Sequence, residues 1–216
     1  MKIQSTPTLR RMPTYLHRLY TLRNNGAEWV TCADLAIYMS LSHIVVRKDM
    51  AMTGLAGNRR YGFRVADLIE AILRFIGWDQ KLSATLVGAG SLGSALLGFS
   101  EFYDYNLRIE SVFDCNPKKI GTQIHNFNIY DINNIKDIFK ESPPDIAIIC
   151  VPSTEAQKVA DLLIKLGVKY FWNFANVCLQ VPEGVIVQRE VIPGGLAVLS
   201  AKIKKHRSGE EIGDEI

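Results

Sequence analysis

Cysteines and long apolar runs are scarce in this sequence. Its four cysteines, Cys32, Cys115, Cys150 and Cys178, lie far apart and form no CxxC pair, which argues against a zinc site and favours reduced thiols. No apolar run approaches the roughly 18 residues of a membrane span, and the N-terminus has Lys2 but no apolar segment of the kind found in export signals. We therefore expect a cytoplasmic protein with no metal and no membrane partner.

Length and composition are those of an ordinary soluble protein, but charge is unevenly distributed. The 216 residues suit one large or two modest domains, and 48% are hydrophobic. Residues 1–80 hold eleven Lys or Arg against six Asp or Glu, a net charge of +5, whereas residues 81–216 hold fourteen against sixteen, a net charge of −2. A basic N-terminal region favours an acidic partner such as nucleic acid.

A glycine-rich stretch in the middle of the chain is the most informative motif. The apolar run Ala84–Val87 predicts a buried strand, residues 88–93 read GAGSLG, and a helical run follows from Ser94 to Phe99. A second apolar strand ends on Asp114, 21 residues past Gly93. This is the context that a dinucleotide-binding GxGxxG fingerprint requires.

Each part of that fingerprint has a physical reason. The first glycine permits a tight turn, the second lets the backbone approach a pyrophosphate, and the third lets the helix approach the strand closely. The helix N-terminus favours the phosphates. We expect Asp114 to accept hydrogen bonds from the adenosine ribose and to repel a 2′-phosphate, which favours NAD(H) over NADP(H). The alternative is a Rossmann-like domain whose groove is vestigial or holds another nucleotide.

The basic N-terminal region has the pattern of a winged helix-turn-helix. Apolar residues recur at helical spacing from Leu9 to Leu22, Thr31 opens a second helix with a capping box to Asp34, and a third helix starts at His43 and carries Arg47 and Lys48. The glycine-punctuated, basic and aromatic residues 54–64 predict a β-hairpin wing, and residues 65–76 predict a fourth helix that ends at Gly77. The alternative is a basic helical domain used only for dimerisation.

The remaining elements alternate as in an α/β domain, after a linker over residues 78–81. Parallel strands place their carboxyl ends on one sheet edge, so residues 88–93, Asp114, Val151-Pro152 and residues 173–175 should converge on one crevice. A short amphipathic helix is expected over Leu196–Ile203. We expect it to contact its own domain and to lead into a polar, disordered tail that begins at Lys204.

Together these motifs resemble those of the Rex redox-sensing transcriptional repressors of bacteria, over nearly the whole chain up to about Lys204. The shared residues are Val46-Arg47-Lys48-Asp49, Tyr61-Gly62, the stretch from Val87 to Leu96, Phe113-Asp114 with Asn116-Pro117 and Lys119-Ile120-Gly121, Val151-Pro152, and Asn173-Phe174-Ala175. The resemblance implies a homodimer in which the Rossmann domains pair and a C-terminal helix crosses into the other subunit. It also implies that NADH releases the protein from operator DNA, whereas NAD+ permits binding.

The resulting fold prediction is an α/β chain with three parts and a tail. Residues 1–80 form a winged-helix DNA-binding domain, 81–190 a Rossmann NAD(H)-binding domain, 191–207 a C-terminal helix, and 208–216 a disordered tail. The predicted cofactor-binding residues are Gly88, Ala89, Gly90, Ser91, Leu92, Gly93, Phe99, Asp114, Lys119, Val151, Pro152, Asn173, Phe174 and Ala175. The predicted DNA-binding residues are Ser42, His43, Arg47, Lys48, Met52, Asn58, Arg59, Arg60 and Tyr61.

Several positions depart from the family pattern. Residues 50–54 read MAMTG where the family has Leu-Ser-Tyr-Phe-Gly, and residues 58–60 read NRR where Lys-Arg-Gly is common. Three sensing positions also differ: His17 replaces a usual Arg, Phe99 a Tyr, and Val191 an Asp. These replacements cannot form a charged, hydrogen-bonded latch. Residues 192–195, Ile-Pro-Gly-Gly, are expected to interrupt the approach to the C-terminal helix. The pattern therefore indicates a divergent member with a weak or altered response to NADH.

Two other functions fit parts of the sequence. A small NAD-dependent oxidoreductase needs an acid or base beside the nicotinamide, but the four histidines, His17, His43, His125 and His206, lie away from the predicted strand ends. We therefore expect no catalytic residue. A dinucleotide-binding paralogue that has lost DNA recognition or its redox response is the other alternative.

Overall fold

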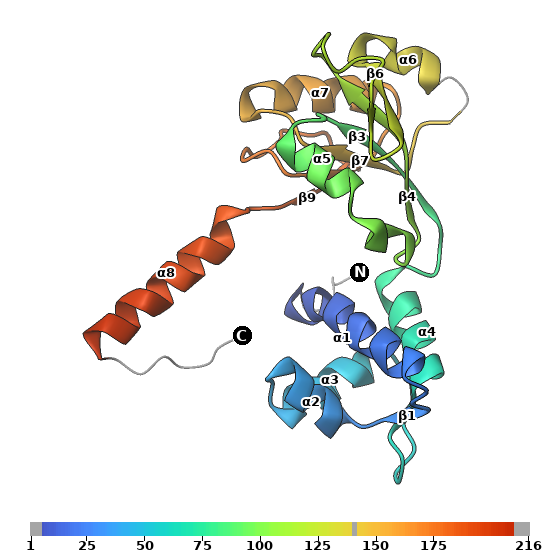
Figure 1. Cartoon of the computed structure of the whole chain (residues 1–216), viewed down its shortest axis with the longest axis vertical. Coiled ribbons are helices and arrows are strands. Elements are labelled where there is room, and N and C mark those ends of the chain that lie inside the picture. Colours follow the sequence, from blue (N-terminus) through green and yellow to red (C-terminus); the bar gives the residue numbers. More distant parts are fainter. Residues whose placement is uncertain (1–5, 140–141, 210–216) are drawn as a thin grey trace. The chain divides into compact units, whose positions relative to one another are not determined.

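The computed structural model describes residues 6–139 and 142–209, and the chain divides into two compact units between Gln80 and Lys81 (Figure 1). The predicted tail falls largely on residues 210–216, and the start of the predicted first-helix region falls on residues 1–5. Both segments lie outside the described residues.

The N-terminal unit is a small helical domain with a two-stranded sheet. Its elements are α1 (Thr6–Asn24), β1 (Trp29–Val30), α2 (Cys32–Met39), α3 (His43–Met52), β2 (Phe63–Arg64) and α4 (Val65–Ile76). Apolar residues at helical spacing, such as Leu16, Leu35, Met50 and Leu68, meet in one fully buried core. The four predicted helices are confirmed, and Gly77 ends α4 in the left-handed conformation.

The capping box of α2 is also confirmed. Thr31 Oγ1 accepts a hydrogen bond from the Asp34 amide at 3.2 Å, and the Asp34 carboxylate accepts one from the Thr31 amide at 3.0 Å. Hydrogen bonds from the side chain and backbone of Thr31 hold the pKa of Asp34 below its usual value. The helix therefore begins at Cys32, as the sequence predicts.

The wing differs from the predicted β-hairpin. Its outer part is closed by a single bridge between Asn58 and Gly62, and strand β2 pairs instead with β1 in antiparallel register. A side chain at Gly62 would collide with the carbonyl oxygen of Val30, and its φ of +82° favours glycine. The close approach of these two segments therefore requires a glycine at position 62.

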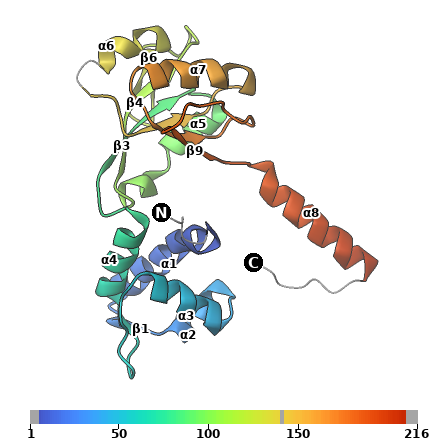
Figure 2. The ribbon, with the colours of Figure 1, turned by 180° about the vertical axis from the view of Figure 1, so that it is seen from behind.

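The C-terminal unit is built on a seven-stranded sheet (Figure 2). Its strands are β3 (Leu82–Val87), β4 (Leu107–Asp114), β5 (Gln123–Ile124), β6 (Phe127–Asp131), β7 (Ile146–Ile149), β8 (Tyr170–Asn173) and β9 (Ile186–Arg189). Their order is β5-β6-β4-β3-β7-β8-β9, and all neighbours are parallel except β5 and β6. Without β5, the order of the six parallel strands is that of a Rossmann sheet.

Alternating side chains of the strands face two different cores. Leu86 and Ile148 contribute to one core with Leu97, and Val87 and Ile149 to the other. The helical elements of this unit are α5 (Ser91–Leu97), η1 (Ser100–Tyr103), η2 (Ile132–Asn134), α6 (Ile135–Ile138), α7 (Ser153–Lys165) and α8 (Pro193–Ser208). Residues of α6 and α7 belong to the core opposite that of α5, so the sheet is covered on both faces.

Three expectations about this unit were wrong. Helix α5 begins inside the glycine-rich stretch at Ser91 and ends at Leu97, so Phe99 lies beyond it. Helix α8 spans Pro193–Ser208, close to the C-terminal helix expected over residues 191–207, but it continues past Ile203, so the tail expected from Lys204 is helical as far as Ser208. Pro193 occupies the first turn of this helix, so residues 192–195 do not interrupt the approach to it. No residue of α8 is buried, and Leu196 is 65% exposed, so this helix is not buried against its own domain as expected.

Candidate cofactor crevice and DNA-binding surface

The glycine-rich loop connects β3 to α5, and two of its glycines are required by their surroundings. Gly88 has φ +102°, and a Cβ there would lie 2.6 Å from the carbonyl oxygen of Cys150. A Cβ on Gly93 would collide with the carbonyl oxygen of Gly88. Gly90, in contrast, has nothing within 4 Å of its Cβ position. The first and third glycines thus serve the fold, whereas the second faces open space, which leaves room for a ligand to approach the backbone there.

Asp114 and Lys119 hold this loop from the neighbouring strand. Asp114 ends β4 and is 8% exposed, and its Oδ2 accepts a hydrogen bond from the Ala89 amide at 2.9 Å. Lys119 Nζ donates to the Ala89 carbonyl at 2.9 Å and lies 3.3 Å from Asp114 Oδ2. The Asn116 amide donates to the other oxygen, Oδ1, at 2.8 Å. The predicted ribose ligand is therefore also the anchor that shapes the loop.

The predicted strand ends meet at one edge of the sheet. Residues Val87, Asp114, Ile149 and Asn173 end the parallel strands β3, β4, β7 and β8. The strand order reverses between β3 and β7, which is the position of the ligand crevice in open α/β sheets. The structure thus brings the loop 88–93, Asp114, Val151-Pro152 and residues 173–175 to a common edge.

Two of the predicted cofactor-binding residues at this edge, Asn173 and Ala175, are buried and form hydrogen bonds within the protein. Asn173 is fully buried, donates from Nδ2 to the Val177 carbonyl at 2.9 Å and accepts from the Ala175 amide at 2.9 Å. Ala175 is 5% exposed. These two residues fix the turn after β8, which leaves Phe174 as the partly exposed side chain of this segment.

An aromatic hollow of about 450 Å³ opens near the same edge. Phe99 lies at its rim, 42% exposed, with its ring centroid 4.9 Å from that of Phe102. Phe102 in turn contacts Trp172, whose indole N–H donates to Glu190. The hollow is lined by Leu96, Phe99, Phe102, Trp172, Phe174, Glu190, Val191 and Ile192. A flat, apolar ring fits such a lining better than a charged group does.

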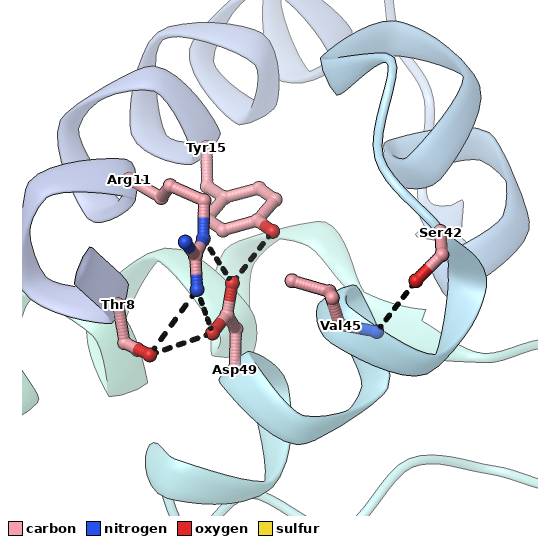
Figure 3. Close-up of polar contacts among 6 residues, drawn as sticks. All are labelled: Thr8, Arg11, Tyr15, Ser42, Val45 and Asp49. Atoms are coloured by element: carbon pink, nitrogen blue, oxygen red, sulfur yellow. Dashed lines mark hydrogen bonds and ion pairs between the residues drawn. The ribbon is translucent and has the colours of Figure 1, made fainter. Parts of the chain in front are cut away.

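Helix α3 presents the predicted recognition surface. Ser42 caps it, and its Oγ accepts a hydrogen bond from the Val45 amide at 3.3 Å (Figure 3). Of the predicted DNA-binding residues on and before this helix, Ser42, His43, Arg47 and Lys48 are exposed, whereas Met52 is half-buried. Val46, Asp49 and Met50 form the buried face. The basic side chains therefore lie on the face that solvent, or a duplex, can reach.

A buried polar network joins this helix to α1, although the sequence pattern did not predict it. Asp49 is 1% exposed and receives hydrogen bonds from Arg11, Thr8 and Tyr15 (Figure 3). The signal was present, because Asp49 lies three residues after Val46 on the helix face that the apolar pattern buries. A charge in that position requires partners.

The electrostatics of the network follow from burial and hydrogen bonding. Burial alone would raise the pKa of the Asp49 carboxyl, but the hydrogen bonds from Arg11, Thr8 and Tyr15 and the charge of Arg11 outweigh it, so the pKa is lowered. The hydrogen bond to Asp49 raises the pKa of Arg11 despite its own burial. Burial and the charge of Asp49 raise the pKa of the Tyr15 phenol. Asp49 is thus held as a carboxylate and Tyr15 as a neutral donor.

The wing carries the remaining predicted DNA contacts. Asn58, Arg59, Arg60 and Tyr61 are all exposed. Asn58 Oδ1 accepts hydrogen bonds from the Arg60 and Tyr61 amides at 2.8 and 3.1 Å, which fixes the turn. The wing loop projects beyond the helices of its unit (Figures 1 and 2).

The three positions that depart from the expected sensing pattern form no charged latch among the described residues of their own units. His17 is exposed, with Nδ1 3.3 Å from the Tyr38 hydroxyl. Phe99 and Val191 are 42% and 44% exposed. In the part of the chain that the structure describes, no group of three or more His, Cys, Asp or Glu could hold a metal ion, and no helix is long and apolar enough to cross a membrane.

Comparison with known families assigns a different kind of domain to each end of the chain. A family model described as "Putative DNA-binding protein N-terminus" matches residues 5–51, and one described as "CoA binding domain" matches residues 79–177. The second is consistent with a nucleotide-binding sheet and the first with the helical unit.

Similar proteins extend over nearly the whole chain. The redox-sensing transcriptional repressor Rex of Treponema denticola is 39% identical over 198 residues, which cover 92% of this chain and 94% of that protein. The same repressor from Clostridium botulinum is 33% identical and covers 93% and 96%. A Rex-family repressor, RSP, solved with β-NAD+ and operator DNA, superposes with a TM-score of 0.84 at 28% identity, with 96% and 95% coverage. The same repressor with β-NADH gives a TM-score of 0.82 at 27% identity, with 96% and 97% coverage.

Proposed function

This chain belongs to the Rex family of redox-sensing transcriptional repressors, and from that premise we propose that it binds operator DNA as a homodimer and leaves it when NADH occupies the C-terminal unit. It acts in the cytoplasm, where a bacterial operator is found. The observation that carries the proposal is that Arg47 and Lys48 are both exposed on helix α3, whose opposite face is buried in the core of its unit.

The DNA-binding residues have separate tasks. Arg47 and Lys48 reach a major groove from α3, while Arg59 and Arg60 contact the backbone or minor groove from the wing. A homodimer meets two successive half-sites if its recognition helices stand about 34–36 Å apart. Ser42 and His43, at the start of α3, lie closest to the phosphates that flank the groove.

The crevice geometry supports one placement of the cofactor. The pyrophosphate lies over the loop at Gly90, where there is open space and where the first amides of α5 have no acceptor within the helix. Asp114 receives the adenosine ribose and Lys119 adds positive charge beside it. The aromatic hollow at Phe99 and Phe174 receives the nicotinamide. To empty the operator, bound NADH must favour the DNA-free state over the DNA-bound state by about 3–5 kcal/mol.

Membership of a repressor family sets aside the oxidoreductase alternative. The other alternative, a dinucleotide-binding paralogue with a lost redox response, is favoured by one observation: His17, Phe99 and Val191 cannot build the charged latch. The two proposals share the DNA surface and differ in how strongly NADH acts on it.

The test is a gel-shift assay with promoter fragments from the protein's own genome, with NADH, with NAD+ and without cofactor. We expect Arg47→Ala and Arg60→Ala to abolish the shift at the protein concentration that half-saturates the wild type, and to leave NADH affinity, measured by calorimetry, unchanged. Arg74→Ala is the control, because Arg74 is an exposed base on α4 that pairs with Glu70 away from the predicted surface. Normal operator binding by the Arg47 and Arg60 variants would refute the assignment of this surface, and a shift that ignores NADH would favour the paralogue.

A further inference from the structure

We infer that Trp29, Tyr61 and Arg60 form a wing stack that aims the Arg60 guanidinium at a DNA phosphate, which makes Trp29 a positioning residue for DNA binding. The inference rests on the proposed function and adds to it a residue outside the recognition helix and the wing.

The wing stack is a continuous set of ring and cation contacts. The ring centroids of Trp29 and Tyr61 lie 5.5 Å apart with an interplanar angle of 40°, and the Arg60 guanidinium carbon lies 5.3 Å from the centroid of Tyr61. Both distances are within the range of favourable aromatic and cation–π contacts. The stack therefore runs from a strand of the folded unit to the exposed end of the wing.

The strand supplies the fixed end of this stack. Trp29 and Val30 alternate across β1, so Val30 enters the core and Trp29 points outward. Trp29 is paired in register with Arg64 of β2, and the next pair joins Val30 to Phe63. Trp29 is 36% and Tyr61 47% exposed, so two large aromatic side chains remain at the surface. At the surface, this pair can support a side chain that contacts DNA.

The wing needs such support because little else holds it. Its outer part is closed only by the Asn58–Gly62 bridge and by the turn that the Asn58 side chain caps. Arg60 takes part in no ion pair with another described residue. A guanidinium that uses its flat face on a ring keeps its N–H edges free, and these edges match phosphate oxygens. The stack thus restricts the arginine without occupying its donors.

The experiment uses the full-length protein and a duplex that the wild type selects from a random pool. Trp29→Ala should weaken binding about tenfold, and Trp29→Phe should restore most of it because a ring is again present. Arg60→Ala should weaken binding more and reduce the slope of log K against log salt by about 1. Arg23→Ala is the matched control, since Arg23 also lies over a tyrosine, at 5.0 Å from the Tyr20 ring, but at the end of α1.

Two further measurements decide whether Trp29 acts through Arg60. In the Arg60→Ala background, Trp29→Ala should change affinity less than about twofold, because the group that it positions is absent. Equal losses in both backgrounds, or no rescue by phenylalanine, would overturn the inference. In the absence of DNA, a Trp78→Phe, Trp172→Phe protein reports Trp29 fluorescence alone, and Tyr61→Ala should make it easier to quench with acrylamide. Unchanged quenching would show that the stack does not form. If the wild type selects no duplex, the proposed function fails, and the role assigned to Trp29 fails with it.

Discussion

Arg11 of α1 and Asp49 of α3 form a two-point ion pair inside the N-terminal unit. Arg11 Nε lies 2.7 Å from Asp49 Oδ2, and Arg11 Nη2 lies 2.8 Å from Oδ1 (Figure 3). Thr8 and Tyr15 complete the coordination of the carboxylate at 2.8 and 2.9 Å. Because Asp49 is next to Lys48 in the chain, this pair sets the rotation of the helix that presents the basic residues.

Asp49→Asn should destabilise the protein strongly. The amide keeps the shape but removes the charge, so Arg11 loses its partner in a site where its side chain is only 15% exposed. We expect a loss of about 3 kcal/mol in the free energy of unfolding, measured by urea denaturation at neutral pH. Glu70→Gln, which breaks an exposed pair with Arg74, should cost less than about 0.5 kcal/mol. Similar stability of the two variants would contradict the importance of the buried pair.

The same pair predicts a pH dependence. The pKa of Asp49 is lower in the folded than in the unfolded protein, so its ionised form stabilises the fold fully above the ordinary Asp value of about 4. That stabilisation is lost as the pH falls through the folded pKa. The stability difference between wild type and Asp49→Asn should therefore be constant from about pH 7 to pH 5 and shrink in stronger acid. A difference that grew on acidification would mean that the carboxyl is protonated in the folded protein.

Two glycine variants separate the fold of the loop from its ligand contact. Gly93→Ala should lower the melting temperature and abolish NADH binding, because its Cβ would collide with the Gly88 carbonyl. Gly90→Ala should leave the melting temperature nearly unchanged, since nothing lies within 4 Å, yet weaken NADH binding about tenfold or more by blocking the pyrophosphate. Calorimetry and thermal unfolding check both. Full NADH affinity in Gly90→Ala would place the pyrophosphate elsewhere.

Restoring the latch residues should strengthen the redox response. The triple variant His17→Arg, Phe99→Tyr, Val191→Asp reintroduces the charged and hydroxyl groups of the family pattern at three exposed positions. We expect the ratio of operator Kd with NADH to that with NAD+ to rise at least about fivefold over wild type. Fluorescence anisotropy of a labelled operator measures this ratio, and Tyr38→Phe, which alters only the neighbour of His17, serves as the control. An unchanged ratio would show that this chain transmits the cofactor signal by other contacts.

The sequence predicted well those features that depend on residues close together in the chain. The capping box of Thr31 and Asp34 depends on residues three apart, and the burial pattern and Gly77 stop of α4 depend on one helix. Strand β1 was missed because two residues are too few to show a periodicity. Trp29 belongs to a strand only because it pairs with Arg64, 35 positions away. Strand β5 was missed for the same reason.

Side-chain partners at the candidate site were harder to predict than their positions. The fingerprint correctly placed Asp114 at the strand end beside the loop, but its bond to the Ala89 amide depends on how two strands are aligned. Likewise, the motif containing Asn173 indicated the crevice edge, whereas the bond to Val177 depends on the turn that follows. Spacing in sequence fixes which residues arrive at an edge, but packing decides which atoms remain available there.

The hold of Asp114 and Lys119 on Ala89 means that the loop is shaped during folding rather than by its ligand. Binding of the adenosine end of the cofactor then costs little entropy for ordering the loop. Oxidised and reduced cofactor are identical at that end, so in the proposed placement this anchor would bind both alike and could not distinguish them, since equal affinity shifts no equilibrium. In the proposed placement, the choice between the two oxidation states would fall to the opposite end of the dinucleotide, where a planar, cationic ring or a puckered, neutral one would meet the rings of Phe99 and Phe174.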